Sequence, residues 1–468
     1  MQRALVHRQR SALGSMMDPL LFDKGPAEPP SPAQVAEQAS GSPRLRVPHR
    51  SQVEMHWASL DELLEADHRV RLVWASVAGL RLDLWLREIK AVEGNVGRDA
   101  TDPRLLVALW VYATLEGIGS ARAPARLCQK HLDYQWLCGG VTVNHHMLSD
   151  FRSQGGDKWS DLLTQIVASL LAAGLVAMNR VAQDGMRVRA SAGKASFRRR
   201  VRLEACLDEA RQQVETLQQL ADESPEELSK RQCAARQRAT RERAARIEEA
   251  IHNCQELQAQ REAAAQKSGC KPTEVRASTT DPESRVMRFP DGGYQPGYNV
   301  QFSTDTETGV IVGMDVTNAG SDQEQLPPML DQLQERYDRL PDEALVDGGF
   351  ASLAAIDAAS QAGCTVYAPL KEEEKQLNAG SDPYAKKKGD SDAVAAWRAR
   401  MGTAAAKGIY KLRCQTAEWV NAMARNRGMQ QMPVRGQSKC RTVAAIYAIT
   451  HNLMQALKLR AEPILMSG

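Results

Sequence analysis

Hydrophobic residues recur at helical spacing from Leu60 to about Gln154, with leucines and valines three or four positions apart. The spacing predicts three helical segments, from Leu60 to Val77, from Leu105 to Val111 and from Leu127 to Leu137. Gly139-Gly140 ends the third segment, and Asn144 is placed to cap a further helix. Two short helices joined by a glycine turn can form a helix-turn-helix, but the pattern alone favours an ordinary helical bundle.

An alternating pattern replaces the helical one between Arg180 and Ala190. Met186 and Val188 alternate with arginines, which is typical of a half-buried strand. Asp184 shares the parity of these two apolar residues, so its side chain is expected on the same face of the strand. An acidic residue on an apolar face requires a partner or a function.

A heptad-like pattern in residues 198–267 predicts two paired helices. The two apolar stripes consist of Leu203, Leu207, Ala210, Val214 and Leu217, and of Ile247, Ile251, Cys254 and Leu257. Ser224-Pro225-Glu226-Glu227 is typical of a helix start, because Ser can cap, Pro suits the first turn and Glu completes a capping box. Strand-like sequence resumes after this helical hairpin, which is therefore expected to be an insertion.

Strands and helices alternate in the rest of the chain. Predicted strands cover Tyr298–Phe302, Gly309–Val316, Ala344–Val346 and Cys364–Leu370, and predicted helices cover Gln323–Leu340, Ala351–Ala362 and a long segment from about Ile409. Such alternation indicates an α/β sheet with helices packed on it.

Composition permits this fold without identifying a function. The 468 residues are 43% hydrophobic and 25% charged, which is enough for two or three domains with a core. The formal net charge of +3 neither requires nor excludes a nucleic acid partner. The nine cysteines form no CxxC pair, which argues against a zinc module or a disulfide framework and fits a reducing cytoplasm.

No segment of the sequence predicts export or a membrane span. Residues 1–50 are rich in Pro, Ser, Gly and Arg and are expected to be disordered. Within them, Met1 to Ala27 lacks the sustained apolar core of a signal peptide. The longest apolar run, Leu162–Met178, contains polar residues and is short for a bilayer span, so a buried helix leading into a strand is expected.

Three carboxylates are candidates for a shared, metal-dependent chemistry. Asp347 follows an apolar strand, at the kind of strand end where open α/β sheets bind ligands. Glu418 lies on the predicted C-terminal helix, two turns before Arg425. Taken singly, Asp347 is more simply an Asp-Gly turn and Glu418 a surface glutamate. With Asp184, however, they would supply the oxygen ligands for two Mg²⁺ ions roughly 3.5–4 Å apart, as phosphoryl transfer requires.

Basic residues gather near these acids in the sequence. Those closest to them include Arg187, Arg413, Arg425 and Arg435. Such groups can neutralise phosphates and release counterions from DNA, although a solvated surface explains any one cluster equally well. His145 and His146 have no Cys or carboxylate at ligand spacing, so no metal site is expected there.

The order of these motifs resembles the DDE transposases of bacterial insertion sequences, which have a ribonuclease-H-like core. The resemblance covers about Leu60 to Leu457. Its N-terminal pieces are Asp102-Pro-Arg-Leu-Leu106, Gly117–Arg122 and His145–Arg152. Its core pieces are Asp184-Gly185, Thr280–Arg285, Gly297–Gln301, Val346–Phe350, the signature Tyr410, Arg413 and Glu418, then Arg435-Gly436 and His451–Leu453. Each piece is weak alone, whereas their order and spacing together are specific.

The resemblance implies a catalytic set and a group of DNA contacts. The implied catalytic residues and ligands of two Mg²⁺ or Mn²⁺ ions are Asp184, Asp347 and Glu418. Tyr410 and Arg413 would contact or position transposon-end DNA, and Arg425 stands where many relatives carry Lys, which keeps the charge for a phosphate. Arg435 and Arg187 complete the predicted DNA contacts.

The resemblance also implies a domain arrangement. The fold class would be α/β, with a ribonuclease-H-like mixed sheet and flanking helices, interrupted by a helical hairpin insertion and preceded by an all-α N-terminal domain. The expected parts are a disordered segment at residues 1–50, a helical DNA-binding domain at 51–160, a catalytic domain at 161–197 and 268–460, and the hairpin at 198–267.

The expected function is metal-dependent cleavage at transposon ends followed by transfer of the 3′-hydroxyl into target DNA. The expected partners are the terminal inverted repeats and target DNA, with a homodimer assembled on DNA and no membrane. The expected location is the cytoplasm, in association with the nucleoid. Two alternatives stay open: a ribonuclease-H-like nuclease without strand transfer, and a catalytically inactive, transposase-derived DNA-binding protein. The presence of all three acids counts against the second alternative.

Overall fold

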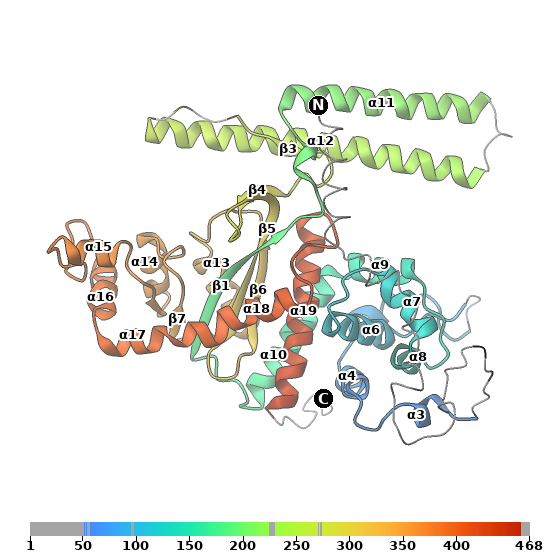
Figure 1. The fold of residues 1–468 in the computed structure, drawn as a ribbon, viewed down its shortest axis with the longest axis horizontal. Coiled ribbons are helices and arrows are strands. Elements are labelled where there is room, and N and C mark those ends of the chain that lie inside the picture. Colours follow the sequence, from blue (N-terminus) through green and yellow to red (C-terminus); the bar gives the residue numbers. More distant parts are fainter. Residues whose placement is uncertain are drawn as a thin grey trace, which may run out of the picture. The chain divides into compact units, whose positions relative to one another are not determined.

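The computed structural model of the chain describes residues 51, 53, 57–94, 98–223, 230–269, 271 and 274–459. The segment 1–50, which is expected to be disordered, lies outside these residues, and so does the predicted helix start at 224–227. The described residues form a mixed α/β structure with many helices, as the alternating pattern predicts (Figure 1).

Within the described residues, six strands form one mixed sheet. They are β1 (Arg180–Arg189), β4 (Arg285–Arg288), β5 (Tyr294–Asp305), β6 (Ile311–Thr317), β7 (Glu343–Leu345) and β8 (Thr365–Tyr367). Their order is β4-β5-β1-β7-β8, and β6 also pairs with β5. β1 runs antiparallel to β5 and parallel to β7, which is parallel to β8. The sheet therefore changes from antiparallel to parallel pairing at β1.

Strand β1 confirms the alternation predicted for residues 180–190. Met186 and Val188 are fully buried, and Asp184 shares their side of the strand. On the opposite side Gln183 is also buried, and its Nε2 donates to the carbonyl of Gln325. Both faces of β1 are thus covered, as expected for a strand in the middle of an α/β sheet.

Helices make up the part of the chain between residues 58 and 172. They are α3 (Leu60–Leu63), α4 (Arg69–Ala78), α5 (Asp83–Leu86), α6 (Pro103–Leu115), α7 (Arg122–Lys130), α8 (Leu132–Cys138), α9 (His145–Gln154) and α10 (Gly156–Ala172). Gly139 is left-handed after α8, and the Asn144 side chain accepts from the Met147 amide, so the predicted stop and cap are confirmed. The end of α10 leads toward β1, also as predicted.

Two of the predicted helices are wrong as single segments. The segment from Leu60 is divided, and the ring of His68 caps the Val70 amide at the start of α4. The segment from Leu127 is divided at His131, which is extended. Apolar spacing continues across both breaks because the helices on either side contribute to the same core. Among the helices that the structure describes, none combines the length and apolar composition needed to cross a bilayer.

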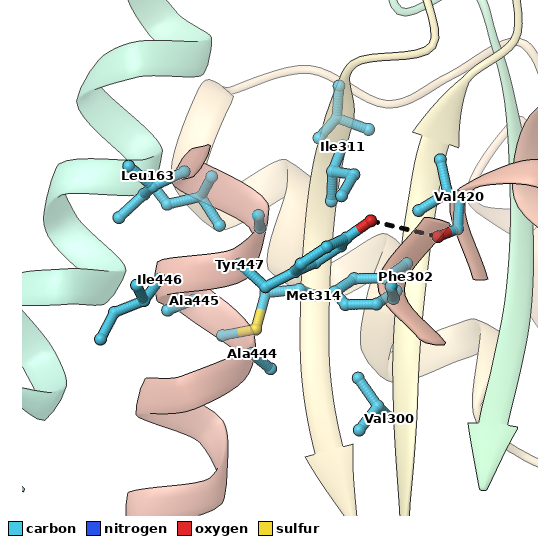
Figure 2. Close-up of a cluster of buried hydrophobic side chains, with 14 of the residues drawn as sticks. Leu163, Val300, Phe302, Ile311, Met314, Val420, Ala444, Ala445, Ile446 and Tyr447 are labelled. Carbon is cyan, nitrogen blue, oxygen red and sulfur yellow. Dashed lines mark hydrogen bonds between the residues drawn. The ribbon is translucent and has the colours of Figure 1, made fainter. Parts of the chain in front are cut away.

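The C-terminal helix α19 (Gln437–Lys458) links the sheet to the N-terminal helices. It packs against β6, and also against α10 and α6. Figure 2 shows Tyr447 of α19 between the sheet residues Phe302 and Met314, with Leu163 of α10 on the other side of the helix. The Tyr447 hydroxyl donates to the carbonyl oxygen of Val420 at 3.2 Å (Figure 2). One helix therefore supports both the sheet and the segment around Val420.

The tail motif His451–Leu453 anchors α19 to the start of β6. Asn452 is fully buried, and its side-chain amide both donates to the Ile311 carbonyl and accepts from the Ile311 amide, each at 2.8 Å. The His451 Nε2 bonds the Gly309 carbonyl at 2.8 Å. The motif His451–Leu453 therefore has a packing role, because it fixes the position of α19 against the sheet.

Two long helices, α11 (Arg200–Glu223) and α12 (Lys230–Ser268), pack on each other as predicted (Figure 1). Leu207, Ala210 and Ile247 form one buried cluster between them. A second cluster contains Leu203 and Cys254 together with residues just after α12. The base of the pair is closed by β2 (Phe197–Arg198), which pairs with β3 (Ala277–Ser278).

Several helices lie between β6 and α19 in the sequence. They are α13 (Leu326–Tyr337), α14 (Leu353–Gln361), α15 (Glu373–Asn378), α16 (Asp392–Met401), α17 (Ala404–Tyr410) and α18 (Trp419–Asn426). The prediction of one long helix from Ile409 is wrong, because α17 ends at Tyr410 and a π-helical turn, η3 (Cys414–Glu418), precedes α18. The pattern also misses α15, which buries no residue and so carries no apolar stripe. Helix α16 was missed too, although its Val394, Trp397 and Met401 are buried.

Candidate active site

The parallel pairing of β1 with β7 brings Asp184 near Asp347, whose charge acts on the Asp184 carboxyl. The pairing of the two strands ends at Ala182 and Leu345, and each acid follows its strand's last paired residue by two positions. Neighbouring strands lie about 4.8 Å apart, and residues in register share a face of the sheet. The two acids therefore extend from adjacent strands toward the same region.

Asp347 forms a tight turn at the end of its strand. Its Oδ1 accepts from the Gly349 amide at 2.7 Å and from the Phe350 amide at 3.3 Å. A Cβ at Gly349 would lie 2.8 Å from this oxygen, so the turn favours glycine there. The Oδ2 atom of Asp347 accepts no hydrogen bond from any described residue. Asp347 can therefore form the turn through Oδ1 and still offer Oδ2 to a metal ion.

Arg413 connects Asp184 with Glu418. Its Nη2 lies 2.7 Å from Asp184 Oδ1, and its Nη1 lies 2.7 Å from Glu418 Oε1. The Arg413 side chain is 9% exposed and that of Asp184 16%, whereas Glu418 is 49% exposed. A nearly buried guanidinium therefore holds together two of the three acids, although one comes from β1 and the other from the C-terminal helices.

The π-helical turn explains how Arg413 and Glu418 meet. They are five residues apart, which in an α-helix would put their side chains roughly 140° apart around the axis. The turn η3 spans Cys414–Glu418, and its wider i→i+5 repeat brings residues five apart onto one side. Thr416 and Ala417 are buried while Cys414 is exposed, so the turn packs on the core with the acid at its edge.

Asn421 is a site residue that the sequence analysis missed. Its Nδ2 donates to Asp184 Oδ2 at 2.8 Å, so both oxygens of Asp184 are engaged. Asn421 is 2% exposed, and its Oδ1 has no hydrogen-bond partner among the described residues. It stands three residues after Glu418, one helical turn away on the same face. That spacing is the only signal by which the sequence could have revealed it.

The electrostatics of the site follow from burial and the close approach of these charges. Burial raises the pKa of the Asp184 carboxyl, Arg413 opposes this effect, and the charge of Asp347 adds to it. Burial alone would lower the pKa of Arg413, but the neighbouring negative groups, Asp184 first among them, outweigh it and raise that pKa. Burial likewise raises the pKa of the Tyr410 hydroxyl, against the influence of Arg413.

A buried polar network lies behind the acids, on the other face of β1. Asp322 is 7% exposed and accepts from Asn299 Nδ2 at 2.6 Å and from Gln301 Nε2 at 2.8 Å. Arg187 pairs with its second oxygen at 3.3 Å. A Cβ at Gly185 would lie 2.0 Å from Asp322 Oδ1, so only glycine leaves room for the network. The motif Gly297–Gln301 supplies two of the donors.

The predicted DNA contacts differ in their relation to the acids. Tyr410 is half-buried beside Arg413, whose guanidinium is engaged by the acids. Arg425, in the last turn of α18, and Arg435, just before α19, are exposed. Arg187 is directed to the network behind the sheet, away from the face that carries the acids.

The donor set fits a hard divalent cation in its chemistry. All three candidate ligands are carboxylates, which Mg²⁺ and Mn²⁺ prefer. Among the described residues, no group of three or more His, Cys, Asp or Glu side chains is close enough to hold a metal ion as these side chains stand. In this arrangement Arg413 supplies the positive charge between Asp184 and Glu418.

Comparison with protein families identifies two matches. Residues 58–154 match the family described as Transposase domain (DUF772), and residues 272–453 match the family described as Transposase DDE domain. Asp347 and Glu418 fall within the second match, whereas Asp184 lies between the two. No curated protein and no solved structure matches the chain. Both matches name transposases, in the order that the sequence motifs predict, and the chain belongs to the DDE transposases of the insertion-sequence type.

Proposed function

We propose that this transposase cuts DNA at the ends of a transposon and joins the 3′-hydroxyl to target DNA through Asp184, Asp347 and Glu418. The observation that carries the proposal is the contact of Arg413 with both Asp184 and Glu418, together with the proximity of Asp347, whose charge acts on Asp184. Three acids that are far apart in the sequence thus share one region. Phosphoryl transfer needs such convergence and no covalent nucleophile.

The sheet supports a ribonuclease-H-like catalytic domain. β1 joins an antiparallel half, β5 and β6, to a parallel half, β7 and β8, which agrees with the mixed sheet that such a core implies. We assign residues 161–197 and 268–460 to this domain and residues 51–160 to a helical DNA-binding domain. Helices α11 and α12, at 198–267, would be a hairpin inserted between β2 and β3.

Each site residue has a proposed role. Two Mg²⁺ or Mn²⁺ ions bound by the three carboxylates would polarise the scissile phosphate and activate the attacking water or 3′-hydroxyl. Asn421 and Arg413 orient the oxygens of Asp184 and limit its motion. Tyr410 and Arg413 border the acids and would position the DNA strand. Arg187 would reach DNA only by leaving Asp322, which makes it the weakest of the proposed contacts.

The exposed arginines and the N-terminal helices would hold the DNA. Arg425 and Arg435 are exposed and would bind backbone phosphates, which supplies affinity without sequence specificity. The helical domain would read the terminal inverted repeats, and two chains would pair on DNA because two ends must be joined. These roles place the protein with DNA in the cytoplasm, as part of the same proposal.

A cleavage and strand-transfer assay tests the proposal. The substrate is a duplex that carries the inverted repeats flanking the coding sequence, incubated with Mg²⁺ or Mn²⁺. Asp184→Asn, Asp347→Asn and Glu418→Gln are each expected to lower the cleavage rate by roughly 10³-fold, since several kcal/mol of transition-state stabilisation is lost. Asp331→Asn and Glu335→Gln, at exposed positions of α13, are matched controls with expected wild-type rates.

The same assay separates the alternatives. Joined products that contain target DNA indicate a transposase, whereas cut products alone indicate a nuclease. Binding without cleavage at any divalent ion concentration indicates an inactive DNA-binding protein. Cleavage at wild-type rates in all three acid variants would exclude this active site.

A further inference from the structure

A second concentration of charge lies at the base of the α11–α12 pair, away from the three acids. A cavity of about 430 Å³ opens there between the two helices, the residues after β3 and the turn before α19. Its charged lining residues are Arg198, Arg202, Glu209, Arg243, Arg246 and Arg435. Five guanidinium groups and one carboxylate therefore face a single cavity, which carries a strong excess of positive charge.

Most of these arginines lack an acidic partner, unlike their neighbours. Arg199 and Arg200, which do not line the cavity, form ion pairs with Glu274 and Glu204 at 2.9 and 2.8 Å. In the cavity, Arg202 approaches Glu209 only to 3.6 Å. The other four have no carboxylate within ion-pair distance among the described residues. Unpaired cations gathered in one cavity repel one another, so an anionic ligand would be stabilising there.

Two further contacts indicate that the cavity is a formed feature. Its floor includes Ile247, which is 1% exposed and packs with Leu207 and Ala210 in the seam between the helices. Arg246 Nε is enclosed by protein and has no hydrogen-bond partner in the described part of the chain. The helices are thus held by their own core, and at least one donor lacks an acceptor.

The cavity is connected to the candidate active site through β1. Arg435 Nε donates to the Ser191 carbonyl at 3.2 Å, and Ser191 follows Asp184 by seven residues. Seven residues span at most about 25 Å, which corresponds to roughly seven nucleotides of DNA at about 3.4 Å each. A DNA duplex bound at the three acids would therefore reach the cavity if it extends roughly seven base pairs beyond them.

We propose that this cavity binds backbone phosphates of the same DNA duplex that the acids cleave, through Arg198, Arg243 and Arg246 in particular. Arginine suits this role, because its planar guanidinium presents paired donors to phosphate oxygens. The site would clamp DNA near the scissile bond without reading its sequence. The inference rests on the proposed function in taking DNA as the ligand, but its test does not depend on cleavage.

The test is the salt dependence of DNA binding in a chelating buffer, with a generic duplex of roughly 30 base pairs, about three helical turns. The full-length triple variant Arg198→Ala, Arg243→Ala, Arg246→Ala is compared with wild type. Each lost phosphate contact lowers the slope of log K against log salt concentration by about 0.9, so a decrease of about 2 to 3 is expected. Thermal denaturation establishes that the variant is folded.

The matched control also removes three arginines. Arg236→Ala, Arg238→Ala and Arg241→Ala are at exposed positions of α12 outside the cavity. It is expected to change the slope by less than about 1. Equal decreases of the slope in both triple variants would show that the effect comes only from the lower net charge. An unchanged slope in the cavity variant would show that no phosphate binds in the cavity. Either result overturns the proposal.

Inorganic phosphate distinguishes a small-anion site from a DNA site. At fixed ionic strength it is expected to leave duplex binding by wild type unchanged. Phosphate could instead raise the thermal stability of wild type but not of the cavity variant, while the salt slope for DNA binding is the same in both. In that case the cavity binds small anions and the proposal fails. Asp184→Asn is expected to keep the wild-type slope, so loss of cleavage and loss of clamping are separate outcomes.

Discussion

At the scale of single residues, the position of the Asp184 carboxylate is set by two side chains from a distant helix. Arg413 neutralises one oxygen and Asn421 bonds the other, although Asn421 is 237 positions away in the sequence. A buried carboxylate needs such partners, because desolvation without compensation is costly. Gly185 contributes from the opposite side by leaving room for Asp322. The strand that carries the acid therefore has polar contacts on both of its faces.

Replacement of Asn421 by Ala tests this positioning. Loss of a residue that orients a metal-binding carboxylate lowers metal affinity or activity by about 10- to 100-fold. We expect the Mg²⁺ concentration for half-maximal cleavage to rise while the affinity for duplex DNA stays the same. Asn426→Ala, at an exposed position of the same helix, is the control. A lowered DNA affinity with normal metal dependence would contradict the assigned role.

At the scale of elements, the segment that carries Glu418 depends on packing against α19. The π-helical turn η3 has a less regular hydrogen-bond pattern than an α-helix, so neighbours must support it. Val420 is fully buried, and its carbonyl accepts from Tyr447 of α19 (Figure 2). Glu418 thus lies on a segment held in place by the helix that also covers the sheet.

Tyr447→Phe removes this one hydrogen bond and keeps the ring. The net contribution of a typical buried hydrogen bond is about 1 kcal/mol, so the free energy of unfolding is expected to fall by about that amount. Urea denaturation measures the change. Tyr294→Phe, at a residue that is 60% exposed, should alter stability by less than about 0.5 kcal/mol. Equal stability of Tyr447→Phe and wild type would mean that the bond does not support the segment.

At the scale of the whole molecule, α19 joins parts of the chain that are far apart in sequence. It packs on β6, α6 and α10, and His451 and Asn452 fasten it to the start of β6. Burial lowers the pKa of His451 to about 4, with the charges of Arg427 and Lys458 acting in the same direction and the bond to Gly309 opposing them. The imidazole is thus neutral in the folded protein near neutral pH.

This histidine predicts a loss of stability in acid. The unfolded chain takes up a proton at His451 below about pH 6.5, whereas the folded chain does so only near pH 4. The contribution of the neutral His451 side chain to the free energy of unfolding is therefore complete above pH 6.5 and is lost as the pH falls to 4. Between pH 7 and pH 5, His451→Gln should lose about 2 kcal/mol less stability than wild type.

Urea denaturation at the two pH values measures this difference. His131→Gln, at an exposed position, is the control and should follow wild type. If His451→Gln and wild type lose the same stability between pH 7 and pH 5, the acid sensitivity arises elsewhere in the chain.

Local hydrophobic pattern was sufficient to predict several of the elements. β1, β5, β6, α13, α14 and the pairing of α11 with α12 follow from spacing alone, because their apolar residues alternate, form a continuous run or recur at helical intervals. The breaks at His68 and His131 and the turn η3 did not follow, because apolar spacing continues across them. Helix α15 was missed since it buries nothing, and α16 was missed although it buries three residues.

The sequence by itself determined the residue types of the candidate site and the family, because the order of short motifs survives without any knowledge of contacts. Only the tertiary structure decided that Asp184 and Asp347 follow paired segments of neighbouring strands, that Arg413 bridges Asp184 and Glu418, and that Asn421 completes the set. It also gathered the arginines of α11, α12 and the turn before α19 around one cavity. Such contacts join residues hundreds of positions apart, and strand pairing and helix packing create them, which no local pattern encodes.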